Sequence, residues 1–305
     1  MNILITGSTG FIGSNLVEKL QVFDHKLYLL KRSSPSISRL ENLQKNVSFL
    51  SIDSYSDLPK IFEKYHFDII MHLATYYIRN EKSLGDIETM NATNITFPSL
   101  LLNLAVKNGV KAFINTGTCF EYKPSTKKLV ETDLLEPYNY YAATKIAFEK
   151  ILKYYAKSDF RALTLKLFFP YGEKDNEKLI PLLIKSFIHS KSFNLTKGEQ
   201  RLNFTYVGDI INAYIKALAF ITSDDYKKYE VFNVGSANTY SPKEIVGMLE
   251  KISKRKIDIL FDTPYPKNEI MYMVCNSEKA KKILGWQPQT NLFEGLKKVY
   301  AFYNK

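Results

Sequence analysis

A tyrosine and a lysine four residues apart, Tyr141 and Lys145, form a pair of side chains that could transfer a proton. On a helix this spacing places both side chains on one face. A free phenol has a pKa of about 10 and exchanges its proton poorly near neutral pH, whereas a nearby ammonium group favours the phenolate. Of the 21 tyrosines only Tyr141 has a lysine four positions later, but in so lysine-rich a chain one such pair is expected by chance. The pair indicates acid–base chemistry only if other motifs build a site around it.

Three glycines near the start of the chain form such a motif, in the segment TGSTGFIG (residues 6–13). It follows an apolar strand-like segment and opens a helical one. In that context Gly7 permits a sharp turn, Gly10 lets the backbone approach a pyrophosphate, and Gly13 lets the helix pack closely on the strand. The N–H groups at the start of the helix then bind phosphate. A tight turn without a ligand is the alternative, but the position between strand and helix favours dinucleotide binding.

The loop after the second expected strand carries basic residues. Many dinucleotide-binding folds place an acidic side chain there, which binds the adenosine ribose of NAD. This chain has Lys31 and Arg32 instead, followed by Ser33 and Ser34 with hydroxyl donors. Cations attract a 2′-phosphate, so the loop predicts NADP(H) rather than NAD(H). The alternative is a solvated basic loop.

Short apolar strands alternate with helical patterns in the first half of the chain. The strands are expected at 1–7, 26–30, 47–53, 67–74, 111–117 and 161–169. Helices are expected at 14–23, at about 86–107, and around Tyr141. Pro98 should kink the second of these or divide it into two helices. This alternation predicts an α/β fold of the Rossmann type, a doubly wound parallel sheet with helices on both faces.

The regular alternation ends near residue 170, where longer loops and proline-containing turns begin. We expect a dinucleotide-binding domain at 1–170, to which 206–235 returns. Residues 171–205 and 236–305 are expected to form a smaller mixed α/β domain that binds the substrate. It ends in an amphipathic helix around residues 292–303.

Composition excludes several classes of protein. The chain has 305 residues, 45% hydrophobic and 24% charged, enough to fold without disulfides. Its two cysteines and four histidines lack the spacing of metal ligands, so no metal is expected. The N-terminal residues do not resemble a signal peptide, and no apolar run approaches the roughly 20 residues that span a bilayer. A cytoplasmic protein with no membrane partner is expected.

The net charge of +11 comes from 36 lysines scattered along the chain, against only six arginines. No dense basic tract is present, as a nucleic-acid-binding protein would have. The charge therefore predicts a solvated lysine-rich surface with a bias toward anionic substrates, and no nucleic-acid partner.

Together these motifs resemble the extended short-chain dehydrogenase/reductase family, in the branch that acts on nucleotide sugars. The resemblance covers nearly the whole chain and is carried by TGSTGFIGSNL (6–16), YAATK (141–145), RLNFTYVGDIINAY (201–214) and KILGWQPQTNLFEGL (282–296). It implies an NAD(P)-dependent oxidoreductase with Tyr141 and Lys145 as catalytic residues. A catalytic Ser or Thr is expected at the end of the preceding strand, where Thr116 and Thr118 both lie. Thr118 is preferred because its distance to Tyr122 matches the family's spacing.

The resemblance also implies two sets of binding residues. Those expected to bind the cofactor are Gly7, Ser8, Thr9, Gly10, Phe11, Ile12, Gly13, Lys31, Arg32, Ser33, Asp53, Leu73, Ala74, Thr116, Tyr141, Lys145, Phe168 and Phe169. Those expected to bind the substrate are Thr75, Thr118, Tyr141, Pro170, Lys178, Leu179, Arg201 and Lys267. Arg201 is expected on a diphosphate, because a planar guanidinium suits phosphate. Solvated surface positions are the alternative for Lys178 and Lys267.

Two further segments, IIMHLATYY (69–77) and NEIMYMVCNSEKAKKILGW (268–286), resemble the CDP-dideoxyhexose synthases of bacterial surface polysaccharide (lipopolysaccharide) pathways. These reduce CDP-linked 4-keto sugars with NADPH. The resemblance implies reduction of a nucleotide-linked, foremost CDP-linked, 4-keto-6-deoxyhexose. An epimerase or dehydratase without net cofactor turnover, and a non-catalytic NADP-binding regulator, are the alternatives. A homodimer through two helices per subunit, including the Tyr141 helix, is expected by family analogy.

Overall fold

The computed structural model describes residues 1–33, 36–40, 43–156, 160–175 and 178–305, so Ser34 lies outside the described residues. The chain divides into two compact units. The first comprises Met1–Lys123, Leu134–Lys166 and Ala213–Phe232, and the second Pro124–Asp133, Leu167–Asn212 and Asn233–Lys305. Residues 124–133, which the sequence pattern assigns to the dinucleotide-binding part, belong to the second unit.

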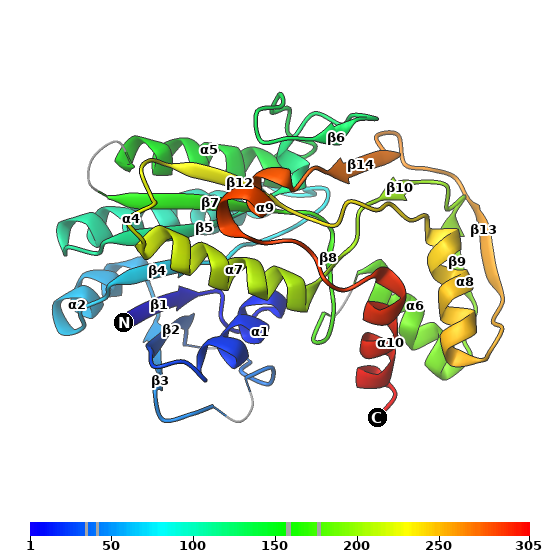
Figure 1. Cartoon of the computed structure of the whole chain (residues 1–305), viewed down its shortest axis with the longest axis horizontal. Coiled ribbons are helices and arrows are strands. Elements are labelled where there is room, and N and C mark those ends of the chain that lie inside the picture. The colour runs from blue at the N-terminus through cyan, green and yellow to red at the C-terminus, as the bar shows by residue number, and fades with distance from the viewer. Residues whose placement is uncertain (34–35, 41–42, 157–159, 176–177) are drawn as a thin grey trace. The chain divides into compact units, whose positions relative to one another are not determined.

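A seven-stranded sheet in the order β12-β7-β5-β4-β1-β2-β3 organises the chain (Figure 1). Its strands are β1 (Asn2–Thr6), β2 (Lys26–Arg32), β3 (Val47–Ile52), β4 (Ile69–His72), β5 (Ala112–Thr118), β7 (Arg161–Leu167) and β12 (Glu230–Val234). β1 pairs in parallel with both β2 and β4, and the chain order reverses there. In doubly wound sheets the ligand binds outside the carboxyl ends of the strands at such a reversal. The predicted fold class is confirmed.

Helices flank this sheet on both faces. They are α1 (Phe11–Leu20), α2 (Leu58–Lys64), α3 (Leu84–Asn91), α4 (Phe97–Lys107), α5 (Tyr140–Tyr155) and α7 (Val207–Thr222). Alternate strand residues such as Leu4, Ile70 and Phe113 pack with α2, α4 and α5 in one apolar cluster. α1 takes no part in that cluster and lies on the opposite face (Figure 1). Because successive strand residues point to opposite faces, the apolar runs of these strands are explained by burial on both sides.

The long helical region expected at 86–107 is divided. α3 ends at Asn91, a π-helical turn η2 covers Ala92–Thr96, and α4 begins at Phe97. Pro98 is the second residue of α4 and follows the π turn, whose hydrogen bond runs from the Phe97 N–H to the Ala92 carbonyl oxygen. The break therefore precedes the proline, in a π turn of the kind that often marks functional sites.

The second unit has three small sheets and four helices among its described residues. The sheets are β10-β14-β6, β11-β8 and β13-β9. Their strands are β6 (Lys128–Leu129), β8 (Pro170–Tyr171), β9 (Phe193–Thr196), β10 (Arg201–Leu202), β11 (Thr205–Tyr206), β13 (Ile259–Thr263) and β14 (Tyr272–Cys275). The helices are α6 (Leu179–His189), α8 (Pro242–Ser253), α9 (Glu278–Leu284) and α10 (Leu292–Tyr303). Leu183, Leu249 and Leu296 join α6, α8 and α10 in one core.

None of the helices in the described ranges has the length and apolar character needed to cross a bilayer.

Candidate cofactor and active site

Most predicted site residues of the first unit follow the carboxyl ends of neighbouring strands. Five short segments share this placement: 7–10 after β1, 31–33 at the end of β2, Asp53 after β3, 73–75 after β4, and 116–118 at the end of β5. Since β3, β2, β1, β4 and β5 run parallel in that order, these segments lie along one edge of the sheet. The sheet thus gathers the residues predicted to bind the cofactor and those predicted to do chemistry.

The glycine loop (residues 7–13) has glycines where the backbone packs too closely for a side chain. A Cβ atom at Gly13 would lie 2.1 Å from the carbonyl oxygen of Gly7, so no other residue fits there. Gly10 is the N-cap of α1 and makes no side-chain capping bond. The Ser8 side chain is buried, and its hydroxyl has no hydrogen-bond partner among the described residues. A helix start, whose first N–H groups lack intrahelical partners, and an unpaired hydroxyl together fit a pyrophosphate.

Lys31 and Arg32, predicted in the loop after the second strand, are the last two residues of β2, paired with β3, and a third basic residue lies in the connection that follows. Lys31 Nζ donates to the carbonyl oxygens of Arg32 and Ser33, 3.3 Å from each. Arg39 Nη1 donates to the carbonyl oxygen of Thr9, in the glycine loop, at 3.3 Å. The fold therefore brings a further guanidinium back to the phosphate-binding loop. Its sequence signal is slight: it is one of only six arginines and lies in the same connection as Arg32.

Tyr141 and Lys145 lie on α5 with side chains turned away from solvent. The two residues are 9% and 4% exposed. Burial lowers the pKa of Lys145 to about 8, although the charge of Glu121 opposes this. Burial raises the pKa of Tyr141 well above its ordinary value, and Glu121 adds to the rise, while a hydrogen bond with Thr75 opposes it. The net direction is opposite to the one that the Tyr–Lys spacing suggests, so Tyr141 holds its proton as a general acid must.

The two threonines at the end of β5 differ in how their hydroxyls are used. Thr116 Oγ1 donates to the carbonyl oxygen of His72 at 2.8 Å and lies 2.6 Å from the hydroxyl of Tyr214. Thr118 Oγ1 accepts from the N–H of Phe120 at 3.3 Å. Within the described residues no acceptor is found for the Thr118 hydroxyl proton, whereas that of Thr116 is already donated. This difference favours Thr118 as the group that hydrogen-bonds a substrate carbonyl.

Asn94, in η2, is a site residue that the sequence analysis missed. Its Oδ1 accepts from Thr75 Oγ1 at 3.1 Å and from the N–H of Tyr76 at 2.8 Å. Its Nδ2 donates to the carbonyl oxygen of Tyr76 at 2.9 Å and to Thr144 Oγ1 at 3.0 Å. All four hydrogen bonds that an amide side chain can make are formed. Asn94 therefore fixes the position of Thr75, which itself bonds Tyr141.

Three of the predicted site residues of the second unit are consecutive. Phe168, Phe169 and Pro170 directly follow β7, and Phe169 has a φ of 34°, which is rare for a residue with a side chain. Residues held in such a conformation concentrate at functional sites. Lys174, Ser190 and Lys254, also in the second unit, share a positive φ, so this conformation alone does not single out Phe169.

The charged residues predicted to bind the substrate diphosphate also lie in the second unit. Arg201, in β10, pairs with Glu244 and donates to the carbonyl oxygen of Thr239 at 2.8 Å. Lys178 precedes α6, which begins at Leu179, and both Lys178 and Lys267 are exposed. A diphosphate at Arg201 would have to compete with the Glu244 carboxylate.

The sheet order and the glycine loop define a dinucleotide-binding enzyme fold, and comparison with known proteins identifies its family. Residues 3–235 match the family described as the NAD dependent epimerase/dehydratase family. The chain therefore belongs to this nicotinamide-dependent family of extended short-chain dehydrogenases/reductases. The resemblance inferred from the sequence motifs is confirmed.

Curated relatives match the chain over almost its full length. A CDP-abequose synthase from Salmonella typhimurium is 29% identical, covering 97% of this chain and 96% of the relative. An uncharacterized UDP-glucose epimerase, YtcB, from Bacillus subtilis is 27% identical over 99% of this chain and 98% of its own.

Solved structures are similar over the same extent. UDP-glucose 4-epimerase from Thermotoga maritima, solved with UDP-glucose, is 25% identical with a TM-score of 0.88, covering 99% of this chain and 98% of that one. UDP-glucuronic acid 4-epimerase from Bacillus cereus, solved with UDP-glucuronic acid and NAD, is 26% identical with the same TM-score and coverage. The relatives thus include a synthase and several epimerases.

Proposed function

We propose that the protein reduces a nucleotide-linked 4-keto-6-deoxyhexose with NADPH, and that the nucleotide is CDP. Such a reaction would supply a deoxysugar for bacterial surface polysaccharide. The similarity to a CDP-abequose synthase over 97% of the chain supports the substrate class.

The observation that carries the proposal is the set of cations at the end of β2 and in the connection that follows it. Lys31 and Arg32 occupy the place where an acid would bind the ribose of NAD, and Arg39 reaches the glycine loop. A 2′-phosphate is attracted by such a group of cations and repelled by an acid. NADPH suits a net reduction, because the oxidised cofactor leaves after each turnover. Tightly bound NAD suits an epimerase, which returns the hydride to the same sugar.

The chain's own residues supply binding and proton transfer. When bound, NADPH supplies a hydride. The glycine loop and Ser8 would hold its pyrophosphate. Thr118 donates a hydrogen bond to the sugar carbonyl, and Tyr141 gives its proton to that oxygen as the alcohol forms. Lys145 stabilises the resulting phenolate, which regains a proton from solvent.

Burial raises the pKa of Tyr141, so its phenol is protonated at neutral pH, as a proton donor must be.

Two alternatives make different predictions. An epimerase or dehydratase, which the similar epimerases favour, would form product without net loss of NADPH and would retain its cofactor through purification. A non-catalytic NADP-binding regulator would bind NADPH and form no product. The presence of Tyr141, Lys145 and Thr118 together speaks against a regulator.

The deciding experiment mixes the purified protein with NADPH and separate CDP-, GDP-, dTDP- and UDP-linked 4-keto-6-deoxyhexoses. We expect one NADPH to be oxidised per product formed, followed at the absorbance of the cofactor, and fastest with the CDP sugar. Product formed without oxidation of NADPH would establish the epimerase alternative. The same assay with NADH should be markedly slower.

We further propose a homodimer through α4 and α5. Leu100 on α4 and Tyr154 on α5 are 43% and 67% exposed and would be covered in such a dimer. Light scattering should give the mass of two chains for the wild type. Tyr154→Lys should shift that mass toward one chain, while Lys26→Asp, at the exposed first residue of β2 and in neither helix, should leave it unchanged.

A further inference from the structure

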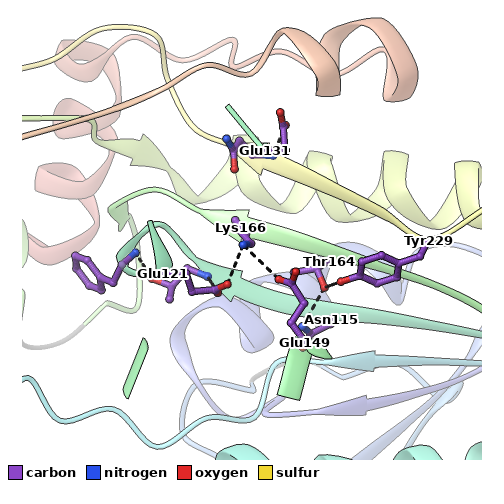
Figure 2. Close-up of polar contacts among 10 residues, drawn as sticks. Asn115, Glu121, Glu131, Glu149, Thr164, Lys166 and Tyr229 are labelled. Carbon is purple, nitrogen blue, oxygen red and sulfur yellow. Dashed lines mark hydrogen bonds and ion pairs between the residues drawn. The ribbon is translucent and has the colours of Figure 1, made fainter. Parts of the chain in front are cut away.

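Three charged residues, none more than 9% exposed, meet inside the first unit (Figure 2). Lys166 Nζ lies 2.9 Å from Glu121 Oε2 and 3.4 Å from Glu149 Oε2. It also lies 4.7 Å from the centre of the Tyr122 ring, within the range of a cation–π contact. We call Glu121, Glu149 and Lys166 the ion-pair cluster. Lys166 belongs to β7, Glu149 to α5, and Glu121 to the short helix η3 (Cys119–Glu121) that follows β5.

One end of the cluster holds the backbone of Thr118. Glu121 Oε1 accepts from the N–H of Thr118 at 2.8 Å, completing a capping box between the two residues. The hydroxyl proposed to bind the substrate carbonyl therefore belongs to a residue whose main chain is fixed by a buried carboxyl group.

The other end of the cluster lies on the helix of Tyr141 and Lys145. Glu149 follows Lys145 by four residues and Tyr141 by eight, so all three share one face of α5. Lys166 thus connects the segment that carries Thr118 with the helix that carries the proton donor. A continuous chain of contacts runs Thr118, Glu121, Lys166, Glu149 and α5.

The local structure makes room for these charges and surrounds them with polar groups. A Cβ atom at Gly117 would lie 2.8 Å from Glu121 Oε1 and 3.0 Å from Lys166 Cγ, so a larger residue would displace the cluster. Thr164 Oγ1, next to the cluster in Figure 2, bonds the Tyr229 hydroxyl at 2.8 Å and Asn115 Nδ2 at 3.1 Å. The site is built to hold the three charged groups in one arrangement.

The electrostatics agree with that arrangement. Burial alone would lower the pKa of Lys166, but its two carboxylate neighbours outweigh burial and raise it, so the ammonium group stays charged. Burial and the nearby Glu149 raise the pKa of Glu121, while Lys166 opposes the rise.

Stability is a poor explanation for such a cluster. Removing charges from water costs several kcal/mol per ion, and apolar residues of the same volume often stabilise a protein equally well. A role in holding β5, β7 and α5 in one arrangement is the alternative explanation.

From these contacts we infer that Glu121, Lys166 and Glu149 are positioning residues, which hold the Thr118 hydroxyl in register with Tyr141 and Lys145 by tying the end of β5 to α5. The inference rests on the proposed roles of Thr118 and Tyr141. None of the three residues needs to touch the substrate.

Lys166→Met tests the connection, with Lys166→Arg as the charge-preserving variant. We expect Lys166→Met to lower kcat on the order of tenfold to 100-fold, the cost of a small misplacement of reacting groups. Its dissociation constant for NADPH, measured by fluorescence, should not change, and Lys166→Arg should restore most of kcat. The substrate probe is CDP-4-keto-6-deoxyglucose.

Glu131→Gln is the matched control. Glu131 Oε1 also accepts a backbone N–H, that of Asn233, at 2.8 Å, but it lies outside the cluster (Figure 2). Its kcat should equal that of the wild type. If Lys166→Met fails to fold, Glu149→Gln removes only the longer ion pair and should lower kcat in the same direction. A kcat of Lys166→Met equal to that of Glu131→Gln, or an equal loss of kcat and NADPH affinity, would overturn the inference.

A second measurement needs no substrate. Hydrogen–deuterium exchange of the free protein should accelerate together in segments 115–122 and 141–150 of Lys166→Met, and in neither segment of Glu131→Gln. Absence of turnover by the wild type with every 4-keto sugar would refute the proposed function. Exchange that is unchanged in Lys166→Met, or that accelerates in only one of the two segments, would refute the positioning role. This outcome does not depend on which reaction the protein catalyses.

Discussion

The glycine loop after β1 and the ion-pair cluster beside β5 differ in the chemical groups that they contain and in what those groups contact. The loop offers main-chain N–H groups at the start of α1, and a Cβ atom at Gly13 would overlap its backbone. The three charged side chains of the cluster bond one another and the main chain of Thr118. In the proposed reaction, cofactor binding depends on the shape of the backbone, whereas the placement of the reacting groups depends on buried charge.

Removing the proton donor should give the largest difference between the effect on kcat and the effect on cofactor affinity. Tyr141→Phe should lower kcat on the order of 1,000-fold, because general acid catalysis contributes that much. NADPH affinity should stay that of the wild type, since the glycine loop is untouched. Steady-state kinetics and fluorescence titration measure the two quantities. A variant that keeps wild-type turnover would remove Tyr141 from the mechanism.

The opposite change damages the loop and spares the cluster. In Gly13→Ala the new Cβ would lie 2.1 Å from the Gly7 carbonyl oxygen, so the turn must shift. We expect NADPH affinity to fall on the order of 100-fold as phosphate contacts are lost. Gly247→Ala is the control, because nothing lies within 4 Å of a Cβ atom at that position in α8. Gly247→Ala should leave NADPH affinity unchanged. Equal losses of affinity in the two variants would contradict a role of the glycine loop in binding the cofactor.

The pH dependence of kcat should report the charge of Lys145. Its pKa is lowered to about 8 by burial, so the ammonium group that stabilises the Tyr141 phenolate is lost above that pH. We expect kcat to fall about tenfold per pH unit above pH 8. A kcat that stays constant up to pH 10 would show that the charge of Lys145 is not needed.

The same residue should affect stability in the opposite direction. Folding lowers the pKa of Lys145 from 10.5 to about 8, so between these values the unfolded chain binds more protons and the free energy of unfolding rises with pH. Below pH 8 the buried charge destabilises the fold. Urea unfolding should therefore find Lys145→Met more stable than the wild type at pH 7. That advantage should shrink by up to about 3 kcal/mol by pH 10.

The smallest expected effect concerns the choice of cofactor. Arg32→Asp, alone or with Arg39→Ala, should weaken NADPH on the order of tenfold, the value of one charge-assisted hydrogen bond, and leave NADH nearly unaffected. Lys111→Asp, an equal change of charge just before the amino end of β5, should affect neither cofactor. Titration with both cofactors measures the ratio. Equal losses of affinity for NADPH and NADH would show that Arg32 is a solvated surface residue and does not select the cofactor.

The two regions also differ in how far the sequence predicts them. The glycine loop is contiguous, and its function follows from local backbone geometry next to a strand and a helix. Tyr141 and Lys145 share a helix face, so their proximity is also predictable. The alternation of strands and helices along the chain follows from its apolar runs, which explains why the fold class was predictable.

Residues that meet only through tertiary structure were not predictable. Lys166 is one of 36 lysines, and nothing near it in the sequence indicates that it meets Glu121 and Glu149. Arg39 returns to the glycine loop through a connection whose path depends on the whole fold. The direction of the Tyr141 pKa depends on burial, which helical spacing does not reveal.

The π turn η2 has a consequence for how this enzyme can change in evolution. A π turn holds one residue more than an α-helical turn, so deleting a single residue from 92–96 would turn η2 into an α-helical turn. The deletion would change the direction of the Asn94 side chain, which makes four hydrogen bonds to Thr75, Tyr76 and Thr144. The length of this segment is therefore constrained together with Asn94.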